Sequence, residues 1–216
     1  MSNFVKNIIS TFIDWMFPPR QSQHVTRVLS QEDILSFPQA KPIDQSTYAL
    51  FAYKDIRVSS LIWEIKYHKN ISLINLVVPL LADVIIEEYA DKNLFENWKN
   101  YFLVPVPSSK KRIQKRGYSH TEEIAQRLTV LLPSTITYIP HALRKTVDTP
   151  EQNKLKNRSL RLTNLHHTQE VTMDFPPESS VILIDDVTTT GATLDESRRA
   201  LKEAGVKNII AFTIAH

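Results

Sequence analysis

Hydrophobic and polar positions alternate along the chain in blocks that predict strands and helices in turn. Runs of β-favouring residues predict strands at 48–53, 101–106, 135–139, 181–184 and 208–214. Stretches with a helical pattern lie between or beside them, at 58–67, 72–89, 120–132 and 194–204. This alternation favours an α/β fold with a mainly parallel sheet flanked by helices.

The first 45 residues are expected to form a small helical and irregular appendage. Residues 4–17 are apolar on one face, which predicts a helix that docks onto the body of the protein or lies on a membrane surface. Residues 18–45 are polar and without a clear period, as in a linker. We therefore divide the chain into 1–45 and 46–216.

Composition narrows the class of protein only in part. The 216 residues suit one α/β domain with a small extra subdomain, and the net charge of +3 permits contact with polyanions without demanding it. Cysteine is absent, which excludes disulfides, thiolate zinc sites and cysteine nucleophiles. The longest apolar run, 73–86, is too short to span a bilayer. A cytoplasmic location is the default expectation.

The segment 181–193, VILIDDVTTTGAT, carries the clearest chemical signal. A buried strand ends in Asp185 and Asp186, and a threonine-rich loop then leads into a helix. Unpaired N–H groups and the positive end of the helix dipole can hold a phosphate there, while the carboxylates can accept hydrogen bonds from ribose hydroxyls. The implied ligand is a ribose 5-phosphate, and a threonine acting only as an N-cap is the simpler alternative.

This segment resembles the phosphoribosyl pyrophosphate (PRPP) signature of type I phosphoribosyltransferases. More of the chain is similar to the ComF family, the phosphoribosyltransferase-like proteins associated with natural competence. The similar stretches are 61–67 (LIWEIKY), 104–107 (VPVP) with 116–118 (RGY), 143–164 and 213–216 (TIAH). The resemblance implies a type I phosphoribosyltransferase-like fold over about residues 48–216.

The resemblance also implies roles for individual residues. Asp185 and Asp186 would hold the ribose hydroxyls of PRPP, with Mg²⁺ bound through PRPP and near this pair. Arg116 is the strongest candidate for binding the leaving pyrophosphate, since a guanidinium forks onto phosphate oxygens. The implied cradle for the 5-phosphate is Thr188, Thr189, Thr190, Gly191, Ala192 and Thr193. The implied pyrophosphate and flexible-loop residues are Lys115, Gly117, Arg144, Lys145 and Gln152.

Simpler interpretations exist for several of these residues. The run from Lys110 to Arg112 can be a solvated face, and 141–165 can be a mobile polar loop or hairpin without chemistry. Two departures from the family pattern also bear on the site. Gln21 to His24 stand where a zinc-binding cysteine pair would begin, so no zinc is expected. The RGFNQ-like motif of the family reads RGYSH, from Arg116 to His120.

Three functions are compatible with this sequence. The first is a PRPP-binding ComF-type protein that supports DNA uptake and the handling of single-stranded DNA in transformation, beside a competence helicase and peripheral to the inner face of the membrane. The second is a Mg²⁺-dependent phosphoribosyltransferase of nucleobase or nucleotide metabolism. The third is a non-catalytic module that senses PRPP.

Overall fold

A parallel five-stranded sheet forms the centre of the protein, in the order β1-β7-β6-β2-β3. The computed structural model describes residues 21–27, 29–146 and 167–216. The strands are β1 (Thr47–Phe51), β2 (Lys99–Pro105), β3 (Thr137–Tyr138), β6 (Ser179–Val187) and β7 (Asn208–Ala215). The predicted α/β class is therefore confirmed. The predicted helix at 4–17 lies outside the described residues.

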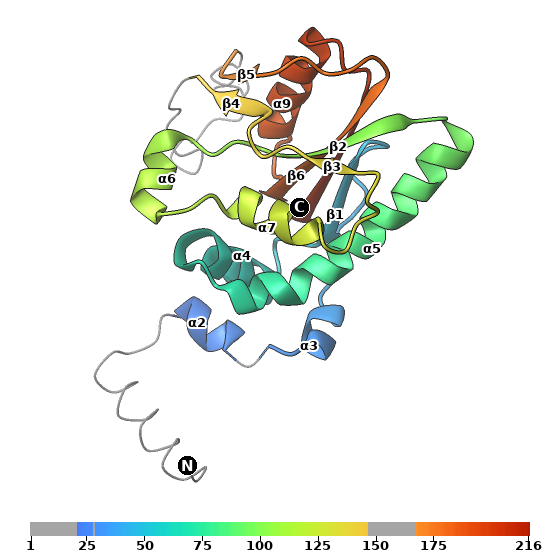
Figure 1. Cartoon of the computed structure of the whole chain (residues 1–216). Helices are drawn as coiled ribbons and strands as arrows, with labels where there is room; N and C mark the ends of the chain where they lie inside the picture. Colours follow the sequence, from blue (N-terminus) through green and yellow to red (C-terminus); the bar gives the residue numbers. More distant parts are fainter. Residues whose placement is uncertain (1–20, 28, 147–166) are drawn as a thin grey trace.

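Helices cover both faces of this sheet (Figure 1). The described helices are α2 (Gln21–Thr26), α3 (Gln31–Leu35), α4 (Ile56–His68), α5 (Ile71–Phe95), α6 (Lys110–Arg116), α7 (His120–Leu128) and α9 (Ala192–Glu203), of which α2 and α3 pack on α4 and α5. Among the helices of the described residues, none combines the length and apolar character needed to cross a membrane.

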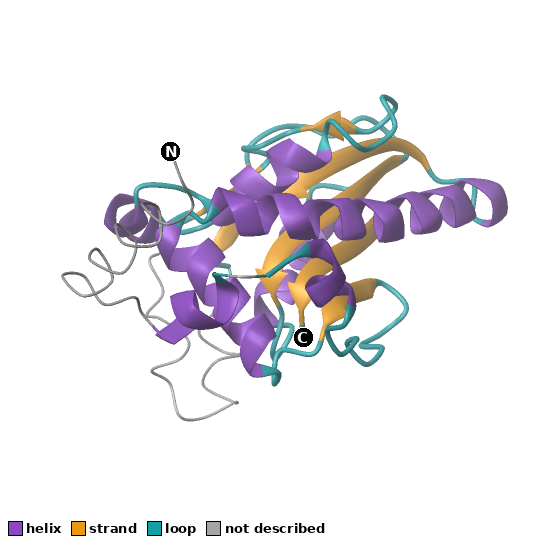
Figure 2. Cartoon of the chain, turned by 90° about the horizontal axis from the view of Figure 1, so that it is seen from below, coloured by secondary structure: helices purple, strands orange, loops and turns teal. Residues whose placement is uncertain are grey.

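Alternation along β6 explains how the layers form. Ile182 and Ile184 belong to the core shared with α4, α5 and α7, whereas Val181 and Leu183 belong to the core shared with α9. Successive side chains of a strand point to opposite faces, so an uninterrupted apolar run is buried on both sides. Figure 2 shows the helices of the first face lying in front of the strands.

Polar caps fix where the helices around the site begin. The side chain of Asp55 accepts a hydrogen bond from the N–H of Arg57 at the start of α4, and Asn70 does the same for Leu73 at the start of α5. Lys69, in the left-handed conformation, separates the two helices. Its N–H donates to the hydroxyl of Tyr118, 3.0 Å away, so the end of α4 is tied to the segment before α7.

Two parts of the chain are more regular than the sequence predicts, and a third, after residue 141, takes the hairpin form that was one of two expectations. Residues 18–45 contain α2 and α3. Helix α3 forms because Ser30 and Asp33 make a capping box and Ile34 is fully buried. The basic segment between the strand predicted at 101–106 and the helix predicted at 120–132 contains α6, whose first turn is capped by Ser109. The region after 141 begins as β4 (Leu143–Lys145), which pairs antiparallel with β5 (Gln169–Val171).

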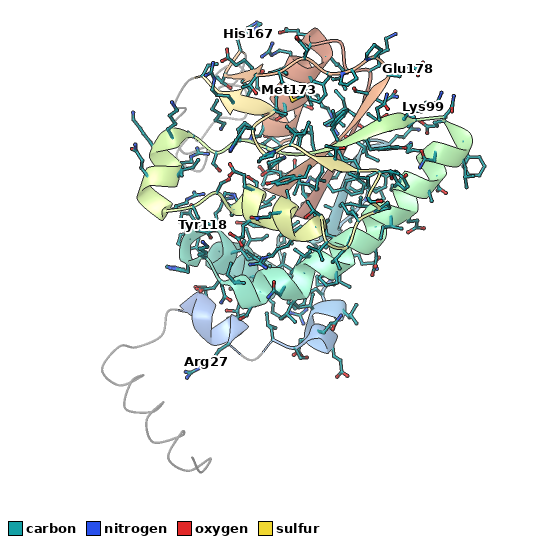
Figure 3. The ribbon with its side chains drawn as sticks, viewed as in Figure 1. Arg27, Lys99, Tyr118, His167, Met173 and Glu178 are labelled. Carbon is teal, nitrogen blue, oxygen red and sulfur yellow. The ribbon has the colours of Figure 1, made fainter. Side chains whose placement is uncertain are left out.

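All described strands of the main sheet point the same way, so their carboxyl ends meet at one edge. Tyr53 follows β1, Val106 follows β2 and His216 follows β7 at this edge. Tyr118 lies on this side of the molecule, whereas Lys99 and Glu178 mark the opposite ends of β2 and β6 (Figure 3). Parallel α/β sheets bind ligands at the carboxyl edge, and the candidate site lies there.

Candidate functional site

A cavity of about 160 Å³ opens at the carboxyl edge of the sheet. Charged side chains from five elements line it: β6, α4, α6, α7 and β4. These residues are Asp185, Asp186, Lys66, Arg112, Arg116, His120 and Lys145. Thr189 and Thr193 close the side nearest α9. Residues far apart in the sequence thus converge on one polar pocket.

The acidic pair occupies the end of β6 and is almost completely buried. Asp185 is 7% exposed and Asp186 is 2% exposed. One oxygen of Asp185 accepts the backbone N–H of Asp186 at 2.9 Å, and Oδ1 of Asp186 accepts the N–H of Val187 at 2.9 Å. These local bonds hold both carboxylates against the backbone at the floor of the cavity.

Two cationic or proton-bearing side chains meet the second oxygen of Asp186. Lys66 Nζ lies 2.7 Å from Oδ2, and His120 Nε2 lies 3.3 Å from the same atom. Lys66 reaches it from α4 and His120 from the first position of α7. Neither residue has a role in the sequence-based prediction. Each lies within a family-like motif, LIWEIKY for Lys66 and RGYSH for His120, and these motifs were the signal that could have pointed to both residues.

The two carboxyl groups differ in their affinity for protons. Burial and the neighbouring Asp186 raise the pKa of Asp185 to about 8. Burial acts in the same direction on Asp186, but Lys66 and His120 outweigh it and bring its pKa well below the ordinary value. The pair therefore contains an ionised Asp186 and, below about pH 8, a protonated Asp185.

Arg116 lies at the end of α6 and faces the cavity. Its guanidinium carbon is 4.5 Å from the ring centroid of Tyr67, and Nη1 is 3.5 Å from Nδ1 of His120. A guanidinium can only donate, so Nδ1 of His120 accepts and Nε2 carries the proton that faces Asp186. Gly117, at φ 80°, ends the helix directly after Arg116.

The threonine loop connects β6 to α9 and has Gly191 as the N-cap residue, at φ 77°. A threonine N-cap, the simpler alternative, is therefore wrong. The first intrahelical bond runs from Asp195 N–H to the carbonyl of Gly191, so the N–H groups of 192–194 precede the hydrogen-bond ladder. Thr188 is buried and its N–H donates to Ala215, whereas Thr189 and Thr193 line the cavity.

Of the remaining predicted residues, Lys145 lies at the cavity and Arg144 at the surface. Lys145 of β4 lines the cavity. Its neighbour Arg144 is outside the lining and donates through Nε to Glu170 at 2.8 Å, with a side chain 62% exposed. Lys115 belongs to α6. Gln152 lies outside the described residues. Arg112, for which a solvated face was the simpler interpretation, lines the cavity.

The residues at the acidic pair include possible ligands for a divalent cation. His120, Asp185 and Asp186 each offer one ligand atom, and within the described part of the chain these atoms lie within 4.8 Å of one another. The ammonium of Lys66, however, already contacts Oδ2 of Asp186. A Mg²⁺ ion bound directly to that oxygen would face this like charge at short range, so the cluster does not fit such an ion.

Comparison with known proteins shows to which class of proteins a chain with this fold and cavity belongs. A family model described as phosphoribosyl transferase domain matches residues 80–216. That range covers the described strands β2, β3, β6 and β7, the acidic pair, the threonine loop and α6.

Curated relatives narrow the class further. The chain is 27% identical to competence protein ComFC of Bacillus subtilis over 167 residues, which cover 77% of this chain and 62% of the relative. It is 30% identical to ComFC of Streptococcus pneumoniae over 120 residues, or 55% and 50% of the two chains. It is 31% identical to competence protein F of Haemophilus influenzae over 115 residues, or 52% and 49%.

The chain therefore belongs to the ComF family of phosphoribosyltransferase-domain proteins. Its matched part spans between about half and 62% of the length of these relatives. The family resemblance inferred from the sequence motifs is confirmed.

Proposed function

We propose that this protein binds PRPP and that PRPP binding supports the handling of single-stranded DNA during natural transformation. The observation that carries the proposal is the single cavity in which the acidic pair, the start of α9 and a group of basic side chains meet. Each of these features suits one part of PRPP: the ribose, the 5-phosphate and the diphosphate.

The start of α9 suits the 5-phosphate. The N–H groups of 192–194 and the side chains of Thr189 and Thr193 are donors, and the helix dipole favours an anion at this end. Asp185 suits the ribose hydroxyls, because Asp186 is already in contact with Lys66 and His120. Of the two acids predicted to hold the ribose hydroxyls, Asp185 is thus the better proposed ligand for them.

The basic side chains suit the diphosphate. Arg116 and Arg112 come from α6 and Lys145 from β4, so cationic side chains from two elements line the cavity. Mg²⁺ bound to the diphosphate oxygens of PRPP would supply further positive charge there. The contribution of the chain itself is electrostatic: its cations offset the negative charge of the bound diphosphate.

Isothermal titration of the purified protein with Mg²⁺-PRPP tests this site. We expect binding, and a loss of about tenfold or more in affinity for Asp185→Ala and for Thr189→Val, because each removes a proposed ligand contact. Lys99→Gln is the matched control, since Lys99 pairs with Glu178 at the opposite end of the sheet. Saturable binding that neither site substitution weakens would overturn the assignment.

The transformation role is supported by the relatives, which are named competence proteins. Its test is complementation of a deletion strain. We expect wild type and Lys99→Gln to restore transformation, and Asp185→Ala to fail at equal protein level. Full restoration by Asp185→Ala would remove the link between the PRPP site and DNA handling.

A second candidate function is nucleobase phosphoribosyl transfer, which the matching phosphoribosyltransferase domain favours. Pyrophosphate release from Mg²⁺-PRPP in the presence of a panel of nucleobases is the discriminating measurement. Base-dependent release would favour the enzyme. PRPP binding without release would favour the third candidate, a sensing module.

A further inference from the structure

The contact between Lys66 and Asp186 bears on which cation neutralises the acidic pair, a side chain of the protein or a bound metal ion. His120, Asp185 and Asp186 have the composition of a small divalent-cation site. The three residues are buried, and carboxylates in such a place need a positive partner. In this protein the positive partner is the ammonium of Lys66.

Lys66 is held firmly in position. It lies on α4, where the neighbouring Ile62 and Ile65 are 2% and 0% exposed, and its own side chain is only 22% exposed. The helix therefore delivers the ammonium to the cavity from a packed layer, not from a mobile loop. Burial by itself would lower the pKa of Lys66, but Asp186 outweighs that effect and raises it, so the group stays charged.

The other positions around Asp186 are also occupied. Oδ1 accepts the N–H of Val187, and Oδ2 is in contact with His120 as well as Lys66. His120 in turn contacts Arg116 through its second nitrogen. A divalent ion would have to displace the ammonium and rearrange both imidazole contacts.

We infer that Lys66 is the built-in cation of the acidic pair and takes the position that a protein-bound divalent metal would need. Any divalent ion at this site then arrives on the diphosphate of the ligand. A ribose phosphate without a diphosphate binds equally well with or without metal. This inference rests on the proposed sugar-phosphate site for its ligand, but its main test does not.

The main test is a Mn²⁺ titration of the ligand-free protein, followed by electron paramagnetic resonance. Wild type is expected to show no stoichiometric site at the acidic pair. Lys66→Gln removes the ammonium and keeps a side chain of similar length, so we expect Mn²⁺ affinity to rise by about tenfold or more. Lys66→Arg, which preserves the charge, is expected to behave as wild type. The double variant Lys66→Gln/Asp186→Asn should lose the gained site.

Two outcomes would overturn the inference. One is a stoichiometric Mn²⁺ site in wild type that Asp186→Asn abolishes. The other is a Lys66→Gln protein with the thermal melt of wild type and no gain in Mn²⁺ affinity. Neither depends on PRPP, so failure of the proposed function is distinguishable as an absence of PRPP binding.

A second measurement covers the case in which Lys66→Gln does not fold. Ribose 5-phosphate is titrated into wild type with Mg²⁺ and again with a chelator. Affinities that agree within about twofold support the inference, because the ligand has no diphosphate to carry a metal. An increase of about tenfold or more with Mg²⁺ would overturn it. Absence of ribose 5-phosphate binding in both conditions would contradict the sugar-phosphate site, and the Mn²⁺ titration of wild type and Asp186→Asn would then decide the inference.

Discussion

The carboxylate of Glu196 in α9 accepts a hydrogen bond from the backbone N–H of Thr168, 2.7 Å away at the start of β5. The same oxygen accepts the N–H of Gln169 at 3.0 Å, and Arg199 pairs with Glu196 from the next turn of the helix. The hairpin that carries Lys145 is thus fastened to the helix whose first turn faces the cavity. Two sides of the candidate site are joined by one buried carboxylate.

Removal of this link is expected to destabilise the protein. In Glu196→Ala two buried N–H groups lose their acceptor and Arg199 loses one of its partners, so the free energy of unfolding should fall by about 3 kcal/mol. Urea denaturation measures it. Glu203→Gln is the control, because Glu203 pairs with the same Arg199 on the exposed side of the helix and should cost no more than about 0.5 kcal/mol. Equal losses for both variants would contradict a structural role for the buried link.

The raised pKa of Asp185 predicts a pH-dependent stability. Its pKa is about 8 in the folded protein against an ordinary value of 3.8, so between these two pH values the folded state holds a proton that the unfolded chain releases. This contribution to stability is present at low pH and is lost as pH rises toward 8, by at most about 1.4 kcal/mol per pH unit. Asp185→Asn mimics the protonated form and removes the effect.

Thermal melts of wild type and Asp185→Asn between pH 5 and pH 9 therefore provide the measurement. The melting temperature of the variant should rise relative to wild type up to about pH 8 and then level off. A constant difference across this range would show that Asp185 does not titrate there.

Gly191 and Gly205 offer a matched pair for the phosphate loop. Both adopt positive φ, 77° and 87°, but only Gly191 precedes the helix start that faces the cavity. Alanine at either position should cost about 1–2 kcal/mol in stability, because a Cβ is strained in this conformation. Only Gly191→Ala should also weaken PRPP binding. Calorimetry with PRPP compares them, and equal affinities would argue against the loop as the phosphate cradle.

The contribution of Arg116 to PRPP binding is expected to depend on the forked shape of its guanidinium as well as on its charge. In Arg116→Lys the charge remains, but the contacts with Tyr67 and His120 and the forked geometry are lost, so PRPP affinity should fall by about tenfold. Arg144→Lys is the comparison, since Arg144 pairs with Glu170 outside the cavity. Similar losses for both would indicate that only the overall positive charge matters.

Local patterns predicted much of the fold, and the misses have identifiable causes. Strands β1, β2, β6 and β7 have dense β-favouring runs, so their positions were predicted within a few residues. No helix was predicted at α6 because its seven residues include five cations and one apolar side chain, and so lack an apolar face. Strand β5 is only three residues long and forms because β4 pairs with it.

The sequence by itself determined the α/β class, the family, and the acidic pair followed by a threonine loop. These depend on the order of residues along the chain, through the periods of strands and helices and through adjacent motifs. Only the tertiary structure decided that Lys66 and His120 meet Asp186 and that Lys145 faces the cavity while Arg144 does not. Such contacts join α4, α7 and β4 to the end of β6, and they arise from packing between elements distant in sequence.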